Sequence, residues 1–491
     1  MVYDGEGETR LRNRFAIGFS VLGAALLAAQ LAQAGVPQKT LFRGAAGPVG
    51  IAVDAQGRLH VSWESSDHHL HYTRIEPGSK QDEVVDATSD CGSWSSIALD
   101  SAGRPHIAYN AFRMVSGAGH YELVYAHFDG TAWHIEDLAE GGAPTAIAID
   151  ANDRPHIAHM TTEYPPLLKY LHLEDTGWQT ETPPGPWGFM HRPISLALDS
   201  GGHAHIGMVS EVVSHPLYVT NASGDWVKVE LADVDAWGIS LALDSLGHPH
   251  VALPLVSGVV RYRHFDGSDW LSEDLYDPND LPPGTSAQPQ DAELTLDGHD
   301  RPAILFKVQV HAYGDAADFV IYTYHDGAEW LGIALARRAA SDWVRLATDP
   351  GGGSEGVYAL RGRGDTQIAR RFQVKLPDPT GDWSTLSVSD EAGRSRVDAV
   401  LEVRNEGAAK SRSAQISFYL SSDAVLDPGD TPLALRKASG ALAPGGTREV
   451  MISFKRLGSL AGLYLIAVLD PLGRLDELDR PSNRIAGFLG N

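Results

Sequence analysis

Residues 96–109 read SIALDSAGRPHIAY, and variants of this phrase recur along the first three quarters of the chain. Five further copies are clear, and a weaker one follows. They begin at Gly50, Ala146, Ser195, Ser240, Glu293 and, for the weak copy, Arg345. Each copy carries an aspartate at its fifth position, and successive aspartates lie 45 to 53 residues apart: Asp54, Asp100, Asp150, Asp199, Asp244, Asp297 and Asp349. A period of about fifty residues indicates a repeat architecture.

Most copies continue with a second phrase, for example LVYAHFDGTAWHIEDL at residues 123–138. The first phrase alternates small and aliphatic residues up to the aspartate. D-x-x-G is then a tight hairpin signal, because the carboxylate accepts backbone N–H bonds and glycine takes a positive φ. The second phrase supplies a third strand, a D-G turn and a fourth strand that opens on tryptophan. Four short antiparallel strands per repeat predict the blade of a β-propeller.

The two ends of the repeat region predict how the ring closes. The seventh copy provides strands up to about Lys375 but has no fourth strand of its own, whereas residues 38–43 (QKTLFR) precede the first copy without a partner. We therefore predict seven blades, with the N-terminal strand completing the last one and removing an exposed sheet edge. The alternative is six blades with residues 345–375 as an appendage. The repeats resemble those of exported bacterial propeller proteins, some loosely called sialidase-like or BNR-like. This resemblance covers residues 38–375, and the predicted propeller domain comprises residues 38–376.

The first 34 residues have the three parts of a secretory signal peptide: basic residues between Arg10 and Arg14, an apolar run from Phe15 to Gln30, and the small-residue motif Ala32-Gln33-Ala34. This pattern predicts export to the periplasm or the exterior. The alternative is that the apolar run is an uncleaved signal-anchor helix. No later segment is apolar and long enough to span a membrane. The single cysteine, Cys91, excludes an intramolecular disulfide. The net charge of −24 disfavours nucleic acid as a partner.

Residues 377–382 are predicted to link the propeller to a second domain, residues 383–491, in which the repeat is absent. Its apolar residues alternate with polar ones, as in half-buried sandwich strands. The segments 403–407 (VRNEG), 418–420 (FYL), 469–471 (LDP) and 477–479 (ELD) resemble the CARDB family, whose members are immunoglobulin-like sandwiches. Ser482-Asn483 departs from the terminal Asn pair of that family. The resemblance implies an all-β spacer module.

One loop of this domain holds three aspartates, Asp423, Asp427 and Asp430, whose oxygens are suitable ligands for calcium. The alternative is an Asp/Gly/Pro-rich hairpin turn. No D-x-D-x-D-G-x5-E loop is present, and the sequence predicts no other cofactor.

Histidines and tryptophans that recur at the same place in successive repeats are predicted to be structural, because a single site on the ring axis breaks the symmetry. The recurring histidines are His60, His106, His156, His205 and His250, and the recurring tryptophans are Trp133, Trp178, Trp226, Trp270 and Trp330. We expect the histidines to hydrogen-bond within and between blades.

Residues that depart from the repeat, near the loops of one propeller face, are the predicted ligand-binding residues. Aromatic side chains ringed by polar groups suit a sugar or a peptide. The predicted set is Trp94, Arg113, Trp187, His191, Arg192, Asp235, Trp237, Lys307 and Trp343. The alternative is that the tryptophans plug the channel between blades.

The sequence thus predicts an exported bacterial binding or adhesion protein, with a carbohydrate or protein ligand on the propeller face. The rival is a secreted carbohydrate-active enzyme that uses the same face. Hydrolysis of a glycoside needs two facing carboxylates, and Glu64, Glu211 and Asp235 are the loop candidates. A sialidase needs an arginine cluster, which Arg113, Arg192 and Arg361 could supply, but its S-x-D-x-G-x-T-W boxes are missing. No catalytic residue is assigned.

Overall fold

The structure is a computed structural model that describes residues 38–490 with internal gaps. The gaps are residues 89, 116–117, 163–164, 186–191, 211–213, 232–233, 278–284, 313–314, 328–329, 338–342, 349–353, 362–366, 375–378, 392, 408–409 and 471–482. The signal-like segment lies outside the described residues. The described part contains no helix with the length and apolarity needed to cross a membrane.

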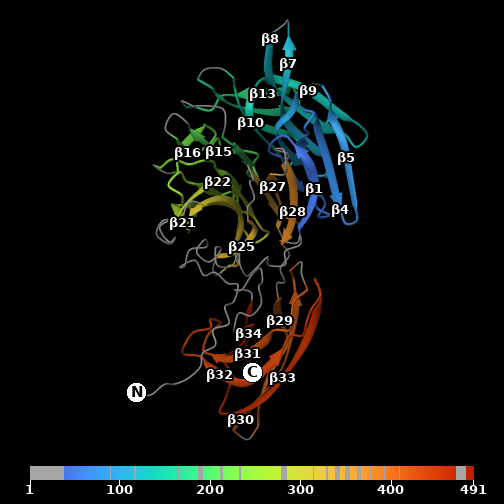
Figure 1. Cartoon of the computed structure of the whole chain (residues 1–491). Helices are drawn as coiled ribbons and strands as arrows, with labels where there is room; N and C mark the ends of the chain where they lie inside the picture. The colour runs from blue at the N-terminus through green and yellow to red at the C-terminus, as the bar shows by residue number, and fades with distance from the viewer. Residues whose placement is uncertain are drawn as a thin grey trace.

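Residues 38–374 form a β-propeller of four-stranded antiparallel sheets, as the repeat predicts (Figure 1). The structure describes seven such sheets, and we number these blades by the repeat that supplies each innermost strand. The innermost strands are β2 (Gly50–Val53), β6 (Cys91–Leu99), β10 (Gly142–Ile149), β14 (Ser195–Leu198), β18 (Ser240–Leu243), β22 (Thr285–Leu296) and β26 (Val344–Thr348). The second strands are β3 (Leu59–Glu64), β7 (Pro105–Val115), β11 (Pro155–Met160), β15 (Ala204–Ser210), β19 (Pro249–Pro254), β23 (Pro302–Ala312) and β27 (Ser354–Arg361).

Each blade is completed by two outer strands. The third strands are β4 (Leu70–Glu76), β8 (Ala118–Phe128), β12 (Leu168–Glu174), β16 (His215–Thr220), β20 (Val260–Phe265), β24 (Asp315–His325) and β28 (Gln367–Val374). The fourth strands are β5 (Ser79–Asp86), β9 (Trp133–Glu140), β13 (Gly177–Glu181), β17 (Val227–Glu230), β21 (Trp270–Tyr276), β25 (Trp330–Arg337) and, in the last blade, β1 (Gln38–Ala45).

The N-terminal strand closes the ring. β1 pairs antiparallel with β28, in the sheet order β1-β28-β27-β26. The innermost strands contact their neighbours in sequence order, and β26 contacts β2. The segment from Val344 to Val374 therefore takes part in the ring instead of forming an appendage. The predicted pairing of the N-terminal strand is observed, and it covers the edge that β28 would otherwise expose.

The D-x-x-G turns have the predicted geometry. Asp54 Oδ1 accepts hydrogen bonds from the backbone N–H groups of Gln56 and Arg58, at 2.9 and 2.8 Å. Gly57 has φ 72° and donates its N–H to the Asp54 carbonyl. In the third repeat Asp153 takes the glycine position with φ 63°. In all six repeats whose aspartate the structure describes, the carboxylate accepts two backbone N–H groups of the turn in this way.

The recurring histidines hydrogen-bond within their blades, which confirms their predicted structural role. In blade 2, His106 Nδ1 lies 2.5 Å from the Tyr125 hydroxyl, and its Nε2 lies 3.7 Å from Asp100. Burial lowers the pKa of His106 to about 4, so its ring is neutral at neutral pH. A neutral ring offers one N–H, and the arrangement assigns it to Nε2, because the ionised aspartate only accepts and the tyrosine O–H donates to Nδ1.

The recurring tryptophans join each blade to its neighbour. Trp178 of blade 3 packs edge-on against Tyr125 of blade 2, with ring centroids 5.3 Å apart, and its indole N–H donates to Glu136 of the same neighbour. Trp133, Trp226 and Trp330 repeat both contacts, whereas Trp270 repeats the edge-on contact with Tyr218. The repeat thus encodes both the inside of a blade and the seam between blades.

Cys91 lies at the start of β6 and is fully buried. Burial raises the pKa of its thiol to about 12, so it is protonated at neutral pH.

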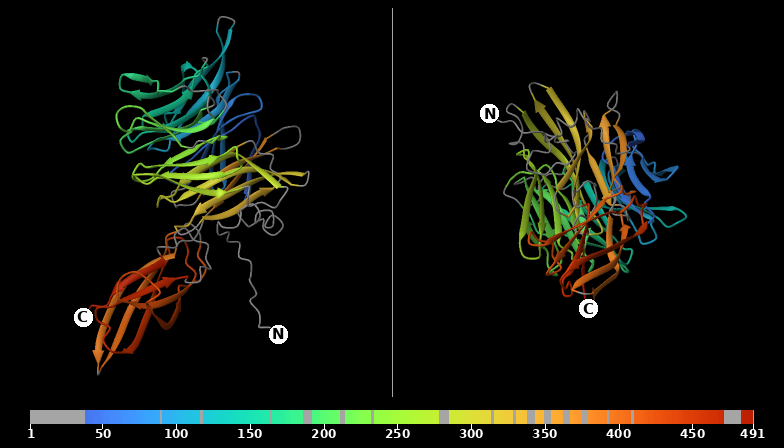
Figure 2. Two further views of the ribbon diagram at one scale, coloured as in Figure 1. Left: turned by 90° about the vertical axis from the view of Figure 1, so that its left-hand side faces the viewer. Right: turned by 90° about the horizontal axis from the view of Figure 1, so that it is seen from below.

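The C-terminal domain is a β-sandwich that lies as a separate body beside the propeller (Figures 1 and 2). One sheet has the order β29-β30-β33 and the other β32-β31-β34-β35. The strands are β29 (Pro379–Glu391), β30 (Arg394–Asn405), β31 (Gln415–Ser421), β32 (Thr431–Ala438), β33 (Thr447–Leu457), β34 (Tyr464–Leu469) and β35 (Arg484–Phe488). The two sheets enclose a core that includes Leu401, Phe418 and Leu465.

The boundary of the sandwich differs from the sequence prediction. Residues 379–382 were predicted to be linker, but they belong to β29 and pair with the end of β30, for example Pro379 with Asn405. The pairing extends the first strand by four residues, which the Pro- and Gly-rich sequence concealed. The ELD motif at 477–479 lies outside the described residues.

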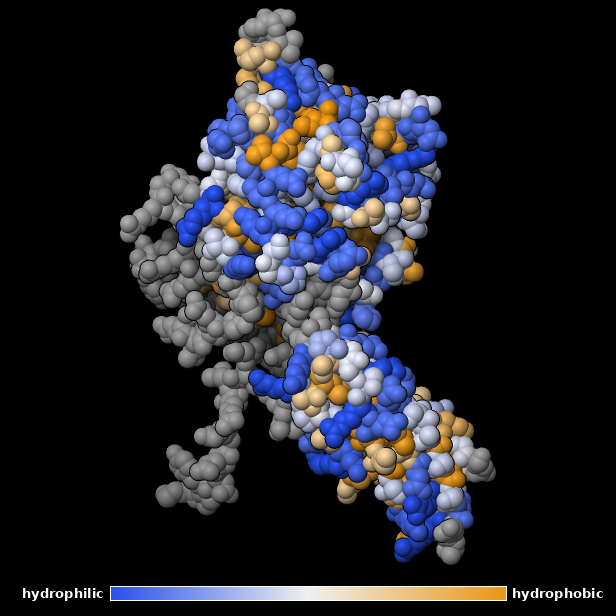
Figure 3. Space-filling view, turned by 90° about the vertical axis from the view of Figure 1, so that its right-hand side faces the viewer, coloured by the Kyte–Doolittle hydropathy of each residue, from blue (hydrophilic) through white to orange (hydrophobic). Residues whose placement is uncertain are grey.

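The face shown in Figure 3 is largely hydrophilic over both domains, with scattered apolar side chains. This agrees with the acidic composition of the chain.

The closure of the ring can be tested at Phe42, which belongs to β1. Its ring stacks on Trp63 of blade 1 with centroids 4.2 Å apart, and only 7% of its surface is exposed. We predict that Phe42→Ala lowers the free energy of unfolding of the propeller by about 3 kcal/mol, because it removes a buried aromatic ring from the seam between the last and first blades. Chemical denaturation followed by circular dichroism measures this. Phe488→Ala, at an exposed ring of the sandwich, should change it little; equal effects of the two substitutions would contradict the proposed seam.

Candidate functional site

The innermost strands surround a cavity of about 210 Å³ on the ring axis. The residue four positions before each repeat aspartate lines it. Five of these residues are small: Gly50, Ser96, Ala146, Ser195 and Ser240. The serines bridge neighbouring strands: Ser195 Oγ accepts the Leu241 N–H at 3.0 Å, and Ser240 Oγ accepts the Leu294 N–H at 2.9 Å. Most of the cavity wall therefore consists of small side chains and backbone.

Blades 6 and 7 break this pattern with charged side chains. Glu293 and Arg345 occupy the same lining position, and Asp291 lines the cavity two residues earlier. Arg345 Nη1 lies 3.3 Å from Asp291 Oδ2 and 3.8 Å from Glu293 Oε2. Asp291 Oδ2 also accepts the Val344 N–H at 2.9 Å. The cavity is thus neutral on most of its wall and carries one guanidinium and two carboxylates on the remaining side.

Burial disfavours the ionised form of both carboxyl groups and so raises their pKa values. It raises the pKa of Asp291 above its usual value, against the opposing effects of Arg345 and two backbone N–H groups. It raises the pKa of Glu293 to about 7, where Arg345 lowers it and Asp291 raises it further. Glu293 is therefore part protonated near neutral pH and can either donate or accept a hydrogen bond in the cavity.

Aromatic and polar side chains from blades 2, 4 and 5 lie next to residues of the cavity wall. Trp94 lines the cavity, half-buried, with φ 53°, and its carbonyl accepts the Thr145 hydroxyl at 2.8 Å. The Trp237 ring is 38% exposed. The Arg192 guanidinium lies 5.2 Å from the centre of that ring and donates to the Ala236 carbonyl. Arg192 and Trp237 do not line the cavity themselves. Each lies within two residues of a wall residue, Pro193 and Ile239 respectively, so the cation–π pair lies on segments that border the cavity.

Of the predicted ligand-binding residues, the structure brings Arg192 and Trp237 together and places Trp94 on the cavity wall. Asp235 is exposed, and its backbone carbonyl accepts a hydrogen bond from the Val256 N–H. Trp187 and His191 lie outside the described residues.

Three of the predictions are not supported by where the side chains lie. Trp343 is 1% exposed and packs in the core between blades 7 and 1. This agrees with the alternative interpretation, in which the tryptophans fill the space between blades. Lys307 is 4% exposed and pairs in register with Asp291, so it lies behind the cavity wall. Arg113 contacts Asp86, Thr88 and Asp137 around blade 2 and is not at the Arg192–Trp237 edge.

Sequence reasoning missed Asp291, Glu293 and Arg345. The signal was present, because the first residue of the repeated phrase changes from Gly, Ala or Ser to Glu and then to Arg. The sequence shows this position only as the start of a strand, and the lining of the cavity shows that its side chain faces the axis.

The aspartates of the sandwich loop cap turns. Asp423 Oδ1 accepts the Val425 N–H, Asp427 Oδ1 the Gly429 N–H, and Asp430 Oδ2 the Asp427 N–H. Within the described part of the chain, these three carboxylates do not converge as a ligand set, whereas Glu64, His68 and Asp90 do. These bonds favour the turn interpretation, and calcium at this loop stays a prediction.

The comparisons with known proteins identify the second domain. Residues 383–486 match the model of the CARDB family. This part of the chain is a CARDB domain. The match agrees with the resemblance seen in the sequence and with the two-sheet sandwich, and the CARDB domain accounts for about a fifth of the chain. None of the curated proteins matches the sequence.

Two solved structures illustrate what the chain resembles in space. The structure of a PL25 ulvan lyase, a polysaccharide lyase, is 12% identical, with a TM-score of 0.49, and the alignment covers 69% of this chain and 96% of that one. An Aleuria aurantia lectin mutant in complex with Fucα1-6GlcNAc is 11% identical, with a TM-score of 0.39, and the alignment covers 61% and 97%. The assignment of the propeller rests on the strand pairing described above.

The electrostatics of the cavity predict a pH effect. Since the pKa of Glu293 is raised in the folded protein, folding favours the protonated acid, and its ionisation costs stability as the pH rises from about 4.5 to about 7. We predict that Glu293→Gln, which mimics the protonated form, is more stable than the wild type at pH 8 by up to about 3 kcal/mol, and that the difference shrinks towards pH 5. Melting temperatures of both proteins across this range measure it. Parallel pH profiles would contradict the raised pKa.

Proposed function

We propose that the chain is an exported bacterial binding or adhesion protein whose propeller binds the end of a glycan at the mouth of the axial cavity. The observation that supports this most directly is the exposed Trp237 ring, stacked by Arg192 beside a cavity that holds Glu293 and Arg345. An aromatic ring packs against the apolar face of a sugar, while carboxylates and a guanidinium accept and donate hydrogen bonds to its hydroxyls. The small volume favours entry of one terminal unit.

The remaining features of the chain fit this proposal. The signal-like segment at residues 1–34 supports export. The acidic composition disfavours a polyanion such as nucleic acid as the ligand. The CARDB domain lies apart from the propeller, so it is suited to space the ligand face from a surface or to dock it there (Figure 2).

A second candidate, a carbohydrate-active enzyme, is favoured by one observation. Asp291 and Glu293 both approach Arg345 on the ring axis, and Glu293 has the raised pKa expected of a general acid. Against it, the Asp291 carboxylate is already engaged by the Val344 N–H and by Arg345, as a structural group would be. Binding is therefore the function we favour.

Trp237 provides the direct test of this function. We predict that the purified protein binds at least one class of oligosaccharide on a glycan array, and that Trp237→Ala weakens this binding at least tenfold by titration calorimetry, because the stacking platform is lost. Phe488→Ala removes an exposed aromatic ring from the CARDB domain and should leave the affinity unchanged. No binding on the array, or equal affinity for Trp237→Ala, would contradict the proposal.

A panel of fluorogenic glycosides and polysaccharide substrates separates the two functions. The binding protein should release no product from any of them. Turnover that disappears in Glu293→Gln, with binding retained, would replace the binding function by the enzymatic one.

A further inference from the structure

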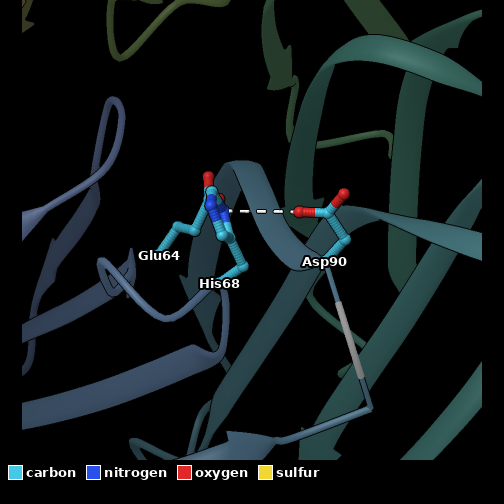
Figure 4. Close-up of side chains that lie close together, drawn as sticks. All are labelled: Glu64, His68 and Asp90. Atoms are coloured by element: carbon cyan, nitrogen blue, oxygen red, sulfur yellow. Dashed lines mark hydrogen bonds and ion pairs between the residues drawn. The ribbon is translucent and has the colours of Figure 1, made fainter.

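Glu64, His68 and Asp90 converge between blades 1 and 2, outside the axial cavity (Figure 4). Glu64 ends β3, His68 lies in the turn that follows it, and Asp90 precedes β6. His68 Nδ1 lies 2.5 Å from Glu64 Oε1 and 3.4 Å from Asp90 Oδ1. The ligand atoms of the three side chains all lie within 4.8 Å of one another. One nitrogen and two carboxylate oxygens thus face a common point.

The charges at this point are unbalanced. The Glu64 side chain is 10% exposed, and His68 Nδ1 is its side-chain donor in the described part of the chain. Asp90 faces the same nitrogen. A neutral imidazole has one N–H, so it satisfies one carboxylate and leaves the other facing a like charge. A nine-tenths-buried carboxylate beside a second carboxylate is destabilised unless a proton or a cation neutralises it. A cation bound at the point where the three side chains meet would do so.

We propose that Glu64, His68 and Asp90 form a binding site for a divalent cation of the zinc class. An imidazole nitrogen with two carboxylate oxygens is a donor set that suits Zn²⁺ and disfavours calcium, which prefers oxygen ligands alone. Two carboxylates neutralise the charge of the ion. Three protein ligands leave a fourth position for water or for an oxygen of a bound molecule.

The distances agree with this assignment after a small movement. Bonds of about 2.0–2.1 Å in a tetrahedral site separate the ligand atoms by about 3.3 Å. The His68–Asp90 separation already has this value. The His68–Glu64 separation must open by just under 1 Å, and the His68 side chain is 53% exposed, so it is free to shift. The hydrogen bond that it makes to Glu64 is the one the ion would replace.

The three side chains lie next to the axial cavity at which the glycan is proposed to bind. Metal binding by Glu64, His68 and Asp90 does not depend on that proposed function. Glu64 Oε2 lies close to Gly47, whose neighbour Pro48 lines the cavity. On the other side, Asp90 stands four residues before Trp94, another wall residue. A bound ion would thus fix the edge of the cavity formed by blades 1 and 2.

Titration calorimetry of the full chain with ZnCl₂ tests the site without any glycan. We expect one tight equivalent of Zn²⁺, weakened at least tenfold by His68→Ala and by Asp90→Asn. His69→Ala is the matched control, because His69 is the adjacent histidine and, among the described residues, its one charged contact is the exposed Asp67. This variant should bind zinc like the wild type. Calcium should bind more weakly than zinc.

His68 and Asp90 are exposed, so their variants should fold, which circular dichroism of the metal-free proteins verifies. Because His68→Ala also removes the side-chain donor to Glu64, the effect of zinc is measured against each protein's own metal-free melting temperature. In the wild type, saturating Zn²⁺ should raise the melting temperature, and in His68→Ala it should not. Unaltered affinity in His68→Ala, several weak equivalents in place of one tight one, or calcium binding tighter than zinc would each overturn the site. Absence of any zinc binding would overturn the site as well.

Discussion

A chain of contacts repeated around the ring determines the rest of this structure. In five blades an aspartate at the turn, a buried neutral histidine and a tyrosine hydroxyl interact in series, and in the same five the tryptophan of the next blade meets that tyrosine edge-on. The histidine is the central member, because one ring nitrogen faces the turn aspartate and the other contacts the tyrosine hydroxyl of the third strand. Each repeat therefore cannot complete its own contacts without its neighbour, which makes the ring cooperative.

The blades that depart from this pattern are the ones that carry charge to the axis. In blade 6, Ala303 takes the histidine position, and Asp297 pairs with Arg301, as Asp54 and Asp100 also pair with the arginine four residues on. The Tyr322 hydroxyl of that blade donates to Ser354 of the last one. The same two blades place Glu293 and Arg345 where the others have small residues. The departures from the repeat and the charged side chains of the cavity therefore both occur in blades 6 and 7, and blade 7 is the one that β1 completes.

The fold could be predicted from the sequence to a large extent, since the period, the D-x-x-G turns and the unpaired strand at residues 38–43 are local signals. The site could be predicted only in part. Trp237 and Arg192 stood out as departures from the repeat, and they lie at the cavity edge. Trp343 departs from the repeat as clearly as Trp237 does, yet it is buried. Its exposure depends on how the strands pack, which the sequence does not show. Glu293 with Arg345, and His68 with Asp90, meet only through contacts between separate blades, which no local pattern encodes.

The stoichiometry of ligand binding tests the central claim, that the repeat builds the scaffold and one asymmetric cavity binds the ligand. Native mass spectrometry of the full chain, titrated with the oligosaccharide that binds best on the array, measures it directly. The account predicts saturation at one ligand per chain. Saturation at five or more ligands would show that the repeated faces of the blades bind, and it would contradict the account.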